Sequence, residues 1–233
     1  GLEPSFSHQF RPLYGRFRVL GEEAPVVAGR RRPLVLLAEA DHDVSELVTL
    51  IADSNGYEIQ TEITNMQALE SVKTHLPDLL VTNVKGRGVD GNTLVNQIRH
   101  GLDSGIQHIP IVMMDTRRRQ HDIREAFMCG TDDYLAKPYD VLDLLRCWRR
   151  AISSLRRPSP LTALINPDGV VRQIALSVLL EKRPDGVVDG LGQLAMTGDD
   201  AYVRAAARWA LRRFGTTAAL EILAKLPGVR ALA

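Results

Sequence analysis

The chain lacks the features that mark several large classes of protein. It has two cysteines, Cys129 and Cys147, which form neither a disulfide framework nor a paired-cysteine metal motif. The histidines show no HxxxH or HExxH spacing, so we expect no metal site. No apolar run approaches the roughly 18 residues that a membrane-spanning helix needs, and no secretory signal is evident. We therefore expect a cytoplasmic protein with no membrane partner.

A strong charge of one sign is also missing, because the formal net charge is only +1. This value argues against nucleic-acid binding over the whole surface, although local basic patches can still bind. Basic residues gather in three places: Arg30 to Arg32, Arg117 to Arg119, and the group Arg146, Arg149, Arg150, Arg156 and Arg157. Each patch is either a solvated face or a contact for nucleic acid or an acidic partner.

Residues 1–32 have no sustained apolar period and are interrupted by prolines and glycines. Six arginines in this segment outnumber its three glutamates. Such composition predicts a basic N-terminal extension that is partly ordered at most.

Residues 33–155 alternate short apolar segments with amphipathic ones. The segment after Asp43 places Val44, Leu47, Val48 and Ile51 on one helical face. The same spacing recurs in three later segments: Ala68, Leu69 and Val72; Leu94, Val95 and Ile98; Val141, Leu144, Leu145, Trp148 and Ile152. Cys147 lies on the last of these faces, so a buried, reduced thiol is expected. Near-continuous apolar strands such as 111–114 predict a parallel sheet covered on both faces, in a doubly wound α/β domain.

Four motifs are spaced along this domain. They read LVLLAEADHD (34–43), PDLLVTNVKGRGVDG (77–91), IPIVMM (109–114) and GTDDYLAKP (130–138). In this order and at this spacing they resemble the bacterial response-regulator receiver domain. The resemblance implies a five-stranded parallel sheet of the receiver or flavodoxin-like type, with a functional pocket beyond the carboxyl ends of the strands.

The resemblance also shows which groups of that pocket have changed. A working receiver has two acids after the first strand that help to hold Mg²⁺, and a phosphate-accepting aspartate at the end of the third. Here the acid pair falls on Glu39 and Ala40, and the acceptor position falls on Asn83. A carboxamide is neutral, much less nucleophilic than a carboxylate and a weaker Mg²⁺ ligand. Asp41, Asp78 and Asp90 lie outside the strand-end position, and we expect them to be solvated or to cap helices.

The positions that would contact the phosphoryl group have changed as well. The family's hydroxyl position falls on Asp115, with Thr116 beside it, whereas Lys137 is retained. Asp115 would place negative charge near phosphoryl oxygens, and two charges about 4 Å apart repel by roughly 4 kcal/mol at an effective dielectric near 20. We therefore expect no phosphorylation, no cofactor and no enzymatic activity. Tyr134 matches the family's aromatic switch position, and its ring could face inward or outward.

Lys137 then has two alternative roles. It could pair with Asp115 or Glu39 and hold the pocket in one state without phosphate. Alternatively, it could reach solvent as a remnant of the ancestral chemistry.

Residues 161–233 contain an approximate internal repeat, which comes after a linker at 156–160 (RRPSP). An offset of 32 residues aligns Val171 with Val203, and it also gives the pairs Arg172–Arg204, Ala175–Ala207, Leu179–Leu211, Val188–Leu220, Leu191–Leu223 and Leu194–Leu226. Each unit is predicted to form helix, turn, helix, and it resembles a HEAT repeat. Because a repeat buries its face only on a neighbour, the segment is expected to dock on the preceding domain, on a second chain or on further repeats.

These expectations combine into a signalling adaptor that is independent of phosphorylation and acts through protein partners. Two alternatives stay open: a DNA-linked transcriptional regulator, which is the usual output of the resembled family, and a sensor of an anionic nucleotide. A homodimer through the last helix of the 33–155 domain is a further alternative. Residues 159–233 show a repeat and no helix-turn-helix signature, so the adaptor is our leading hypothesis.

Overall fold

A computed structural model describes residues 19, 24–27, 32–86, 88–116, 119–153, 160–198 and 201–227. Several arginines of the predicted basic segments lie outside the described residues: Arg11, Arg16, Arg18, Arg30, Arg31, Arg117, Arg118, Arg156 and Arg157. So does the linker apart from Pro160. The chain divides into two compact units, residues 1–116 with 135–155 and residues 117–134 with 156–233. In the described part of the chain, no helix is long and apolar enough to cross a membrane.

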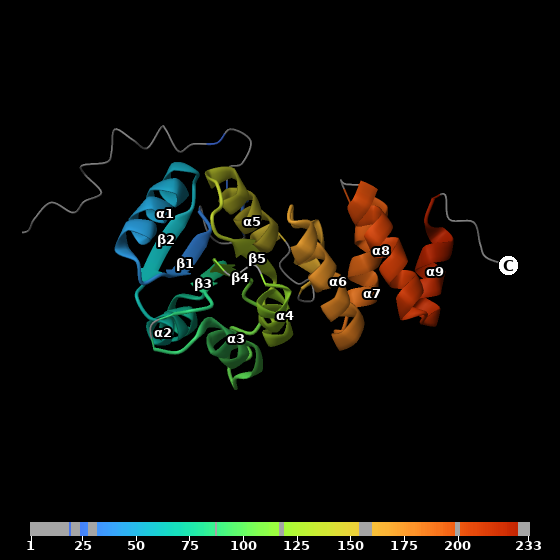
Figure 1. Ribbon diagram of the computed structural model, residues 1–233, viewed down its shortest axis with the longest axis horizontal. Helices are drawn as coiled ribbons and strands as arrows, with labels where there is room; N and C mark the ends of the chain where they lie inside the picture. Colours follow the sequence, from blue (N-terminus) through green and yellow to red (C-terminus); the bar gives the residue numbers. More distant parts are fainter. Residues whose placement is uncertain are drawn as a thin grey trace, which may run out of the picture. The chain divides into compact units, whose positions relative to one another are not determined.

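A five-stranded parallel sheet with the strand order β2–β1–β3–β4–β5 confirms the predicted doubly wound fold (Figure 1). The strands are β1 (Leu34–Ala38), β2 (Glu58–Glu62), β3 (Leu79–Asn83), β4 (Ile111–Asp115) and β5 (Asp133–Ala136). Every residue of β1 and β4 is buried, and so are the first four of β3. Such burial on both faces explains why these strands read as continuous apolar runs.

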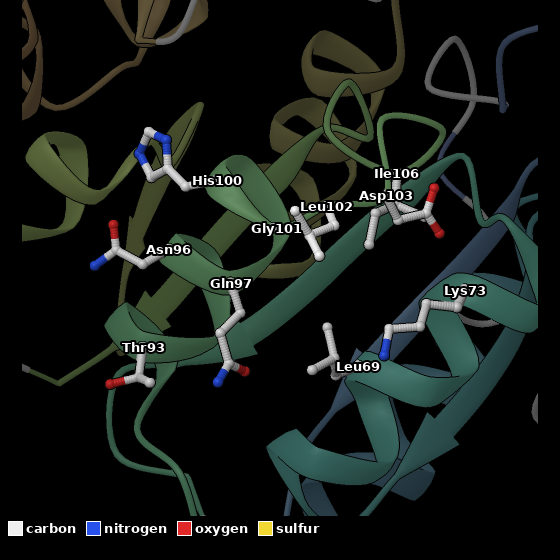
Figure 2. A pocket seen from close by; sticks show the side chains of 10 residues that line it. All are labelled: Leu69, Lys73, Thr93, Asn96, Gln97, His100, Gly101, Leu102, Asp103 and Ile106. Carbon is white, nitrogen blue, oxygen red and sulfur yellow. The ribbon is translucent and has the colours of Figure 1, made fainter.

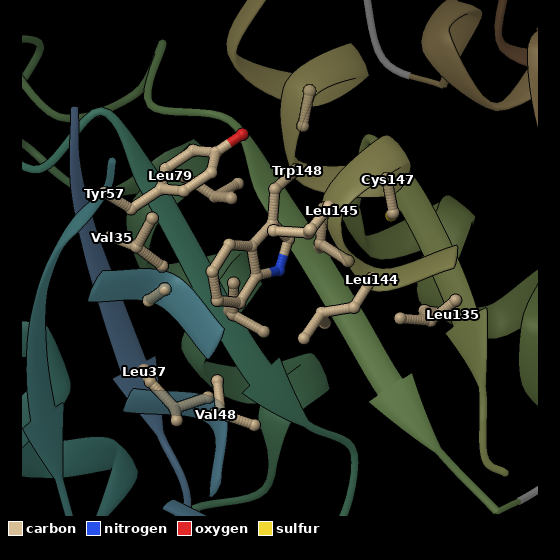
Figure 3. Close-up of a cluster of buried hydrophobic side chains, with 14 of the residues drawn as sticks. Val35, Leu37, Val48, Tyr57, Leu79, Leu135, Leu144, Leu145, Cys147 and Trp148 are labelled. Atoms are coloured by element: carbon tan, nitrogen blue, oxygen red, sulfur yellow. The ribbon is translucent and has the colours of Figure 1, made fainter. Parts of the chain in front are cut away.

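Alternation along the strands sends successive side chains to opposite faces of the sheet. Val35 and Leu37 lie in one core cluster with Trp148, to which α1 (His42–Ser54) and α5 (Val141–Ser153) contribute (Figure 3). The rings of Trp148 and Tyr57 meet edge to face, with centroids 5.5 Å apart. Cys147 is a buried, reduced thiol in the same cluster, as predicted.

The opposite face of the sheet carries α2 (Asn65–His75) and α3 (Gly91–His100). Met113 belongs to this side, because its methyl group lies beside the Cα of Gly91 at the start of α3. The predicted apolar residues of both helices, from Ala68 to Val72 and from Leu94 to Ile98, are buried. The sheet therefore has a packed core on each face.

Three acidic residues that we expected to be structural contribute to the chain's local geometry. Asp41 caps α1 by accepting hydrogen bonds from the amides of Asp43 and Val44, and Asp90 caps α3. Asp78 accepts from the amide of Leu34 at 2.8 Å. Each carboxylate satisfies main-chain donors that would otherwise lack a partner.

Three described residues of the N-terminal extension pack against the core, whereas Val26 is exposed. Val19, Ala24 and Val27 are partly buried beside the cluster that contains Trp148. The amide of Val19 donates to Oδ1 of Asn55 at 2.8 Å. Arg32 forms an ion pair with Asp53 at 2.6 Å and donates to the carbonyl of Tyr57, so this member of the first basic patch is engaged within the fold.

The prediction for the first helix was wrong at one position. Val48 and Ile51 are buried, but Leu47 is 47% exposed. At 100° per residue, Leu47 lies at the margin of the arc centred on Val48 and Ala52, so it reaches solvent.

The repeat segment forms two helix pairs in the second unit, within residues 160–198 and 201–227. The helices are α6 (Gly169–Lys182), α7 (Val187–Thr197), α8 (Ala201–Phe214) and α9 (Thr217–Lys225), and they come after the short 3₁₀ helix η3 (Leu161–Ile165). The aligned apolar positions form the expected core, since all of the following residues are buried: Val171, Ala175, Leu179, Leu191, Val203, Ala207, Leu211 and Leu223. One aligned pair lies outside this core, because Val188 is half-buried and Leu220 is 53% exposed.

This unit also includes α4 (Gln120–Cys129), which precedes the repeats in the sequence and packs against α6 (Figure 1). Arg124 of α4 forms an ion pair with Glu181 and donates to Oγ of Ser177 at 3.2 Å. Nζ of Lys182 donates to the carbonyl of Met128 at 2.7 Å. The first repeat therefore buries one flank on a helix that comes from the 33–155 segment.

A buried asparagine adds hydrogen bonds between the same segments. Nδ2 of Asn166 donates to Oδ1 of Asp133 at 2.6 Å and to the carbonyl of Tyr134 at 2.9 Å. Oδ1 of Asn166 accepts from the amide of Asp168, which in turn caps α6. Because Asn166 and Asp133 are both buried, these bonds fix the start of the repeat segment with little competition from water.

The aligned core predicts a large difference between two leucines of the repeats. Leu211→Ala should lower the free energy of unfolding by about 2–5 kcal/mol, because the site is fully buried and a cavity would remain. Leu220→Ala, at an exposed position, should change it by less than about 0.5 kcal/mol. Urea denaturation monitored by circular dichroism measures both. Equal effects of the two substitutions would contradict the assigned repeat core.

Candidate functional site

Four of the predicted site residues lie at the carboxyl edge of the sheet. Glu39 directly follows β1, Asn83 ends β3, Asp115 ends β4, and Lys137 directly follows β5. These strands are neighbours in the order β1–β3–β4–β5. The fold thus brings together groups that are up to 98 residues apart in the sequence.

The carboxylate of Glu39 is the centre of this site. Its Oε2 accepts hydrogen bonds from Nδ2 of Asn83 at 2.7 Å and from Nζ of Lys137 at 3.1 Å. Its Oε1 accepts from the main-chain amide of Asp41 at 3.0 Å. The side chain of Glu39 is 6% exposed and that of Lys137 is 23% exposed, so the ion pair is largely shielded from water.

These contacts set the ionisation of the neighbouring groups. Burial raises the pKa of Glu39, but the hydrogen bonds from Asn83, Asp41 and Lys137 and the charge of Lys137 outweigh it, so the net pKa is lowered. Burial, with a smaller contribution from the charge of Glu39, raises the pKa of Tyr139 to about 12. At neutral pH the site therefore holds an ionised glutamate and a neutral tyrosine.

Asp115 is arranged differently from Glu39. It is buried, and its Oδ1 accepts from the hydroxyl of Thr116 at 3.2 Å. Its main-chain carbonyl accepts from the amide of Lys137 at 2.7 Å. Of the two expected partners of the Lys137 ammonium group, Glu39 is the one that forms the ion pair.

The remaining predicted site residues differ in their burial and in the unit to which they belong. Ala40 follows Glu39, is half-buried and brings no polar side-chain group. Thr116 is exposed except for its contact with Asp115. Tyr134 belongs to the second compact unit and is 1% exposed, so its ring is buried.

Residues that we had not singled out hold the loop after Asn83. Nδ2 of Asn65 donates to the carbonyl of Val89 at 2.7 Å, and Oδ1 of Asn65 accepts from the hydroxyl of Thr82 at 3.1 Å. A Cβ atom at Gly86 would clash with Asn65, and one at Gly91 would clash with the carbonyl of Asn83. The glycines of the KGRGVDG segment were the signal for close approach, but the sequence does not show that Asn65 is their neighbour.

The donor set determines which chemistry is available at this edge. Asn83 offers an amide where a nucleophilic carboxylate would be needed, and both oxygens of Glu39 are occupied by donors. Among the residues that the structure describes, no group of three or more His, Cys, Asp or Glu side chains is placed to hold a metal ion. The arrangement is that of a structural ion pair with an amide bridge.

A separate pocket of about 600 Å³ lies between α2 and α3 (Figure 2). Its lining includes Leu69 and Lys73 from α2 and Asn96 and His100 from α3. Lys73 already pairs with Glu70 at 2.8 Å. None of the lining residues is an arginine or a predicted site residue, so the pocket adds no observation in favour of the nucleotide-sensor alternative.

The third basic patch lies partly on α5. Arg146 and Arg149 are exposed on this helix, and Arg150 is half-buried. Use of α5 by a protein partner, or by a second copy of the chain, remains a prediction.

Comparisons with known proteins agree with this arrangement. The family of the response regulator receiver domain matches residues 35–148, and HEAT repeats match residues 158–227. The DNA-binding dual master transcriptional regulator RpaA of Synechocystis is 27% identical over 150 residues, which cover 64% of this chain and 60% of RpaA. The chain thus spans about three fifths of that relative.

Two further matches lie within about half of the chain. An uncharacterized 14.6 kDa protein of Leptolyngbya boryana is 30% identical over 112 residues, which cover 48% of this chain and 84% of that protein. A crystal structure from Chloroflexus aurantiacus J-10-fl, assigned as a response regulator, has a TM-score of 0.50 at 27% identity and covers 52% of this chain and 98% of that one. With the sheet order and the strand-end site, these matches establish that the chain carries a response regulator receiver domain followed by HEAT repeats.

Proposed function

We propose that this protein is a signalling adaptor whose receiver domain works without phosphorylation and without enzymatic activity. The observation that carries the proposal is the Glu39 carboxylate, which binds Lys137 and Asn83 together. In this arrangement the lysine that would contact a phosphoryl group already has a permanent anionic partner. The pocket is therefore held in one state by its own side chains.

The identities of the neighbouring residues support the same proposal. Mg²⁺ relies on carboxylate oxygens in near-octahedral geometry, and this edge has Ala40 and Asn83 where two of those carboxylates would lie. Asp115 adds negative charge at the position of the family's hydroxyl group. Acquiring a phosphate here would require Asn83 to act as a nucleophile and the Glu39–Lys137 pair to separate.

The second half of the proposal, action through protein partners, is supported by the repeat segment at 161–233. HEAT-type helix pairs bury one flank on a neighbour and leave the other face for contact. The relative RpaA is described as DNA-binding, and the usual regulators of this family act on transcription. In this chain, however, the segment after the receiver consists of helix repeats, which favours a protein as the partner.

Acetyl phosphate with Mg²⁺ should leave the protein unmodified, because no carboxylate stands at the end of β3. Intact-mass spectrometry measures this. Asn83→Asp alone should also show little modification, since Ala40 and Asp115 are unchanged. The gain of one acid-stable, base-labile phosphate on the unsubstituted protein, mapped to this edge, would overturn the proposal.

Removing the ammonium group should destabilise the receiver domain. Breaking a buried ion pair costs about 3–5 kcal/mol, and breaking an exposed one costs about 0–1 kcal/mol. Because the Glu39–Lys137 pair is partly shielded, Lys137→Ala should lower the free energy of unfolding by an intermediate amount, about 1–3 kcal/mol. Lys73→Ala is the matched control, because Lys73 pairs with Glu70 at 2.8 Å on the surface. Chemical denaturation compares the two variants. An equal, small loss for both would mean that Lys137 is a remnant.

The lowered pKa of Glu39 predicts how this contribution depends on pH. A carboxyl group with a depressed folded-state pKa stabilises the fold fully above its unfolded pKa of about 4.3, and this stabilisation is lost as pH falls through the folded-state value. Between about pH 6 and about pH 3, unfolding free energy should therefore fall less in Glu39→Gln than in the unsubstituted protein. Glu70→Gln, which removes a carboxylate from an exposed site, is the control. Parallel curves for all three proteins would contradict the assigned role of Glu39.

A further inference from the structure

The outward face of α8 combines exposed aromatic and basic side chains around a floor of small residues. At 100° per residue, the exposed Arg212 and the half-buried Arg208 lie on one edge of this face, and Tyr202, Trp209 and Arg213 lie on the other. Ala205 falls between the two edges, Ala201 falls between the two arginines, and both alanines are exposed. We call these seven residues the α8 surface.

The aromatic rings of the α8 surface are held in place by guanidinium groups. Arg213 lies 5.7 Å from the ring centroid of Trp209, and Arg172 of α6 lies 4.6 Å from that of Tyr202. Trp209 is 46% exposed and Tyr202 is 48% exposed. Large aromatic side chains that stay accessible while they are oriented by cations are typical anchors of protein interfaces.

The charge of this helix has one sign. The sequence of α8, AYVRAAARWALRRF, contains four arginines and no acidic residue. Guanidinium groups bind carboxylates with two parallel hydrogen bonds, so a partner that carries Asp or Glu side chains would complement them. The short alanine side chains would allow its backbone to approach α8 closely.

The preceding repeat shows what kind of element fits here. The 32-residue offset aligns Ser177 with Trp209 and Glu181 with Arg213. In the first repeat, Ser177 and Glu181 bind a helix, since both contact Arg124 of α4. In the second repeat, Arg213 stands where the first repeat has Glu181. A helix that binds at this position would therefore need an acidic residue where α4 has Arg124.

We propose that the α8 surface binds an acidic helical segment of a partner protein, with carboxylates on the arginine edge and apolar side chains against Trp209. The inference rests on the proposed adaptor role and specifies the surface and the partner's chemistry. The favoured partner is a protein and not a nucleic acid, because the aromatic edge and the alanine floor suit apolar side chains. A duplex would mainly need phosphate contacts.

The test uses the full chain and labelled synthetic peptides of about 14 residues, the length of α8. One peptide is a helix built from Ala, Leu and Glu, and its counterpart has Lys in place of every Glu. Fluorescence anisotropy should show that the acidic peptide binds and that the lysine peptide binds about tenfold more weakly or not at all. Emission from Trp209 should change on binding, whereas Trp148 is buried in the receiver core.

Two variants decide whether the α8 surface carries the binding. Arg212→Glu combined with Arg213→Glu should weaken the acidic peptide about tenfold or more and should gain binding of the lysine peptide, which also shows that the variant is folded. Trp209→Ala should weaken the acidic peptide without favouring the lysine peptide. Arg146→Glu combined with Arg149→Glu, on the exposed face of α5, is the matched control and should bind as the unsubstituted protein does.

Three results would overturn this inference: no binding of the acidic peptide, equal binding by the Arg212/Arg213 variant, or tighter binding of duplex DNA through the same residues. All three are independent of the phosphate test, because no residue of the α8 surface lies at the carboxyl edge of the sheet. Phosphate transfer to the protein would refute phosphorylation independence while leaving the peptide result as it stands. The two proposals can therefore fail separately.

Discussion

The carboxylate of Glu39 is the interaction on which the functional edge of the receiver domain depends. Through its two oxygens it joins the end of β1 to the end of β3 and to the residue directly after β5. A buried carboxylate is costly unless charge and hydrogen bonds compensate it. Here an amide, a main-chain donor and an ammonium group do so together, and they keep the carboxylate ionised.

The substitution of a carboxylate by Asn83 makes this arrangement feasible. An aspartate at the same position would face Glu39 with a second negative charge and would compete for Lys137. A carboxamide instead donates a hydrogen bond, so the position changes from a repulsive neighbour into a partner. The amide of Asn83 thus stabilises the Glu39 carboxylate where a second carboxylate would repel it.

The repeat segment depends on a neighbouring helix to cover its first flank. Two helix pairs cannot bury both of their flanks on each other, so one flank needs another element. Helix α4 fills this role for the first repeat, with Arg124 and Glu181 supplying complementary charge. Helix α4 lies within the receiver segment of the sequence, but it belongs to the same compact unit as the repeats.

Local sequence patterns were sufficient for the core of both units but not for its margins. The 32-residue offset placed Leu211 correctly in the interior, and the three- and four-residue spacing did so for Val48 and Trp148. It failed for Leu47 because the width of a buried arc depends on the neighbouring helix. For Leu220, the repeat offset preserves the position in the chain but does not supply a covering element, so an aligned leucine remains exposed.

At the site, the sequence by itself determined which chemical groups reach the carboxyl edge of the sheet, including the neutral amide of Asn83 at the end of β3. Strand periodicity and motif order suffice for that, because the ends of parallel strands must meet at one edge. Only the tertiary structure decided that Lys137 pairs with Glu39, that Asn65 holds the loop after Asn83, and that α4 lies against α6. These choices depend on distances between side chains far apart in the chain, and no local pattern encodes such distances.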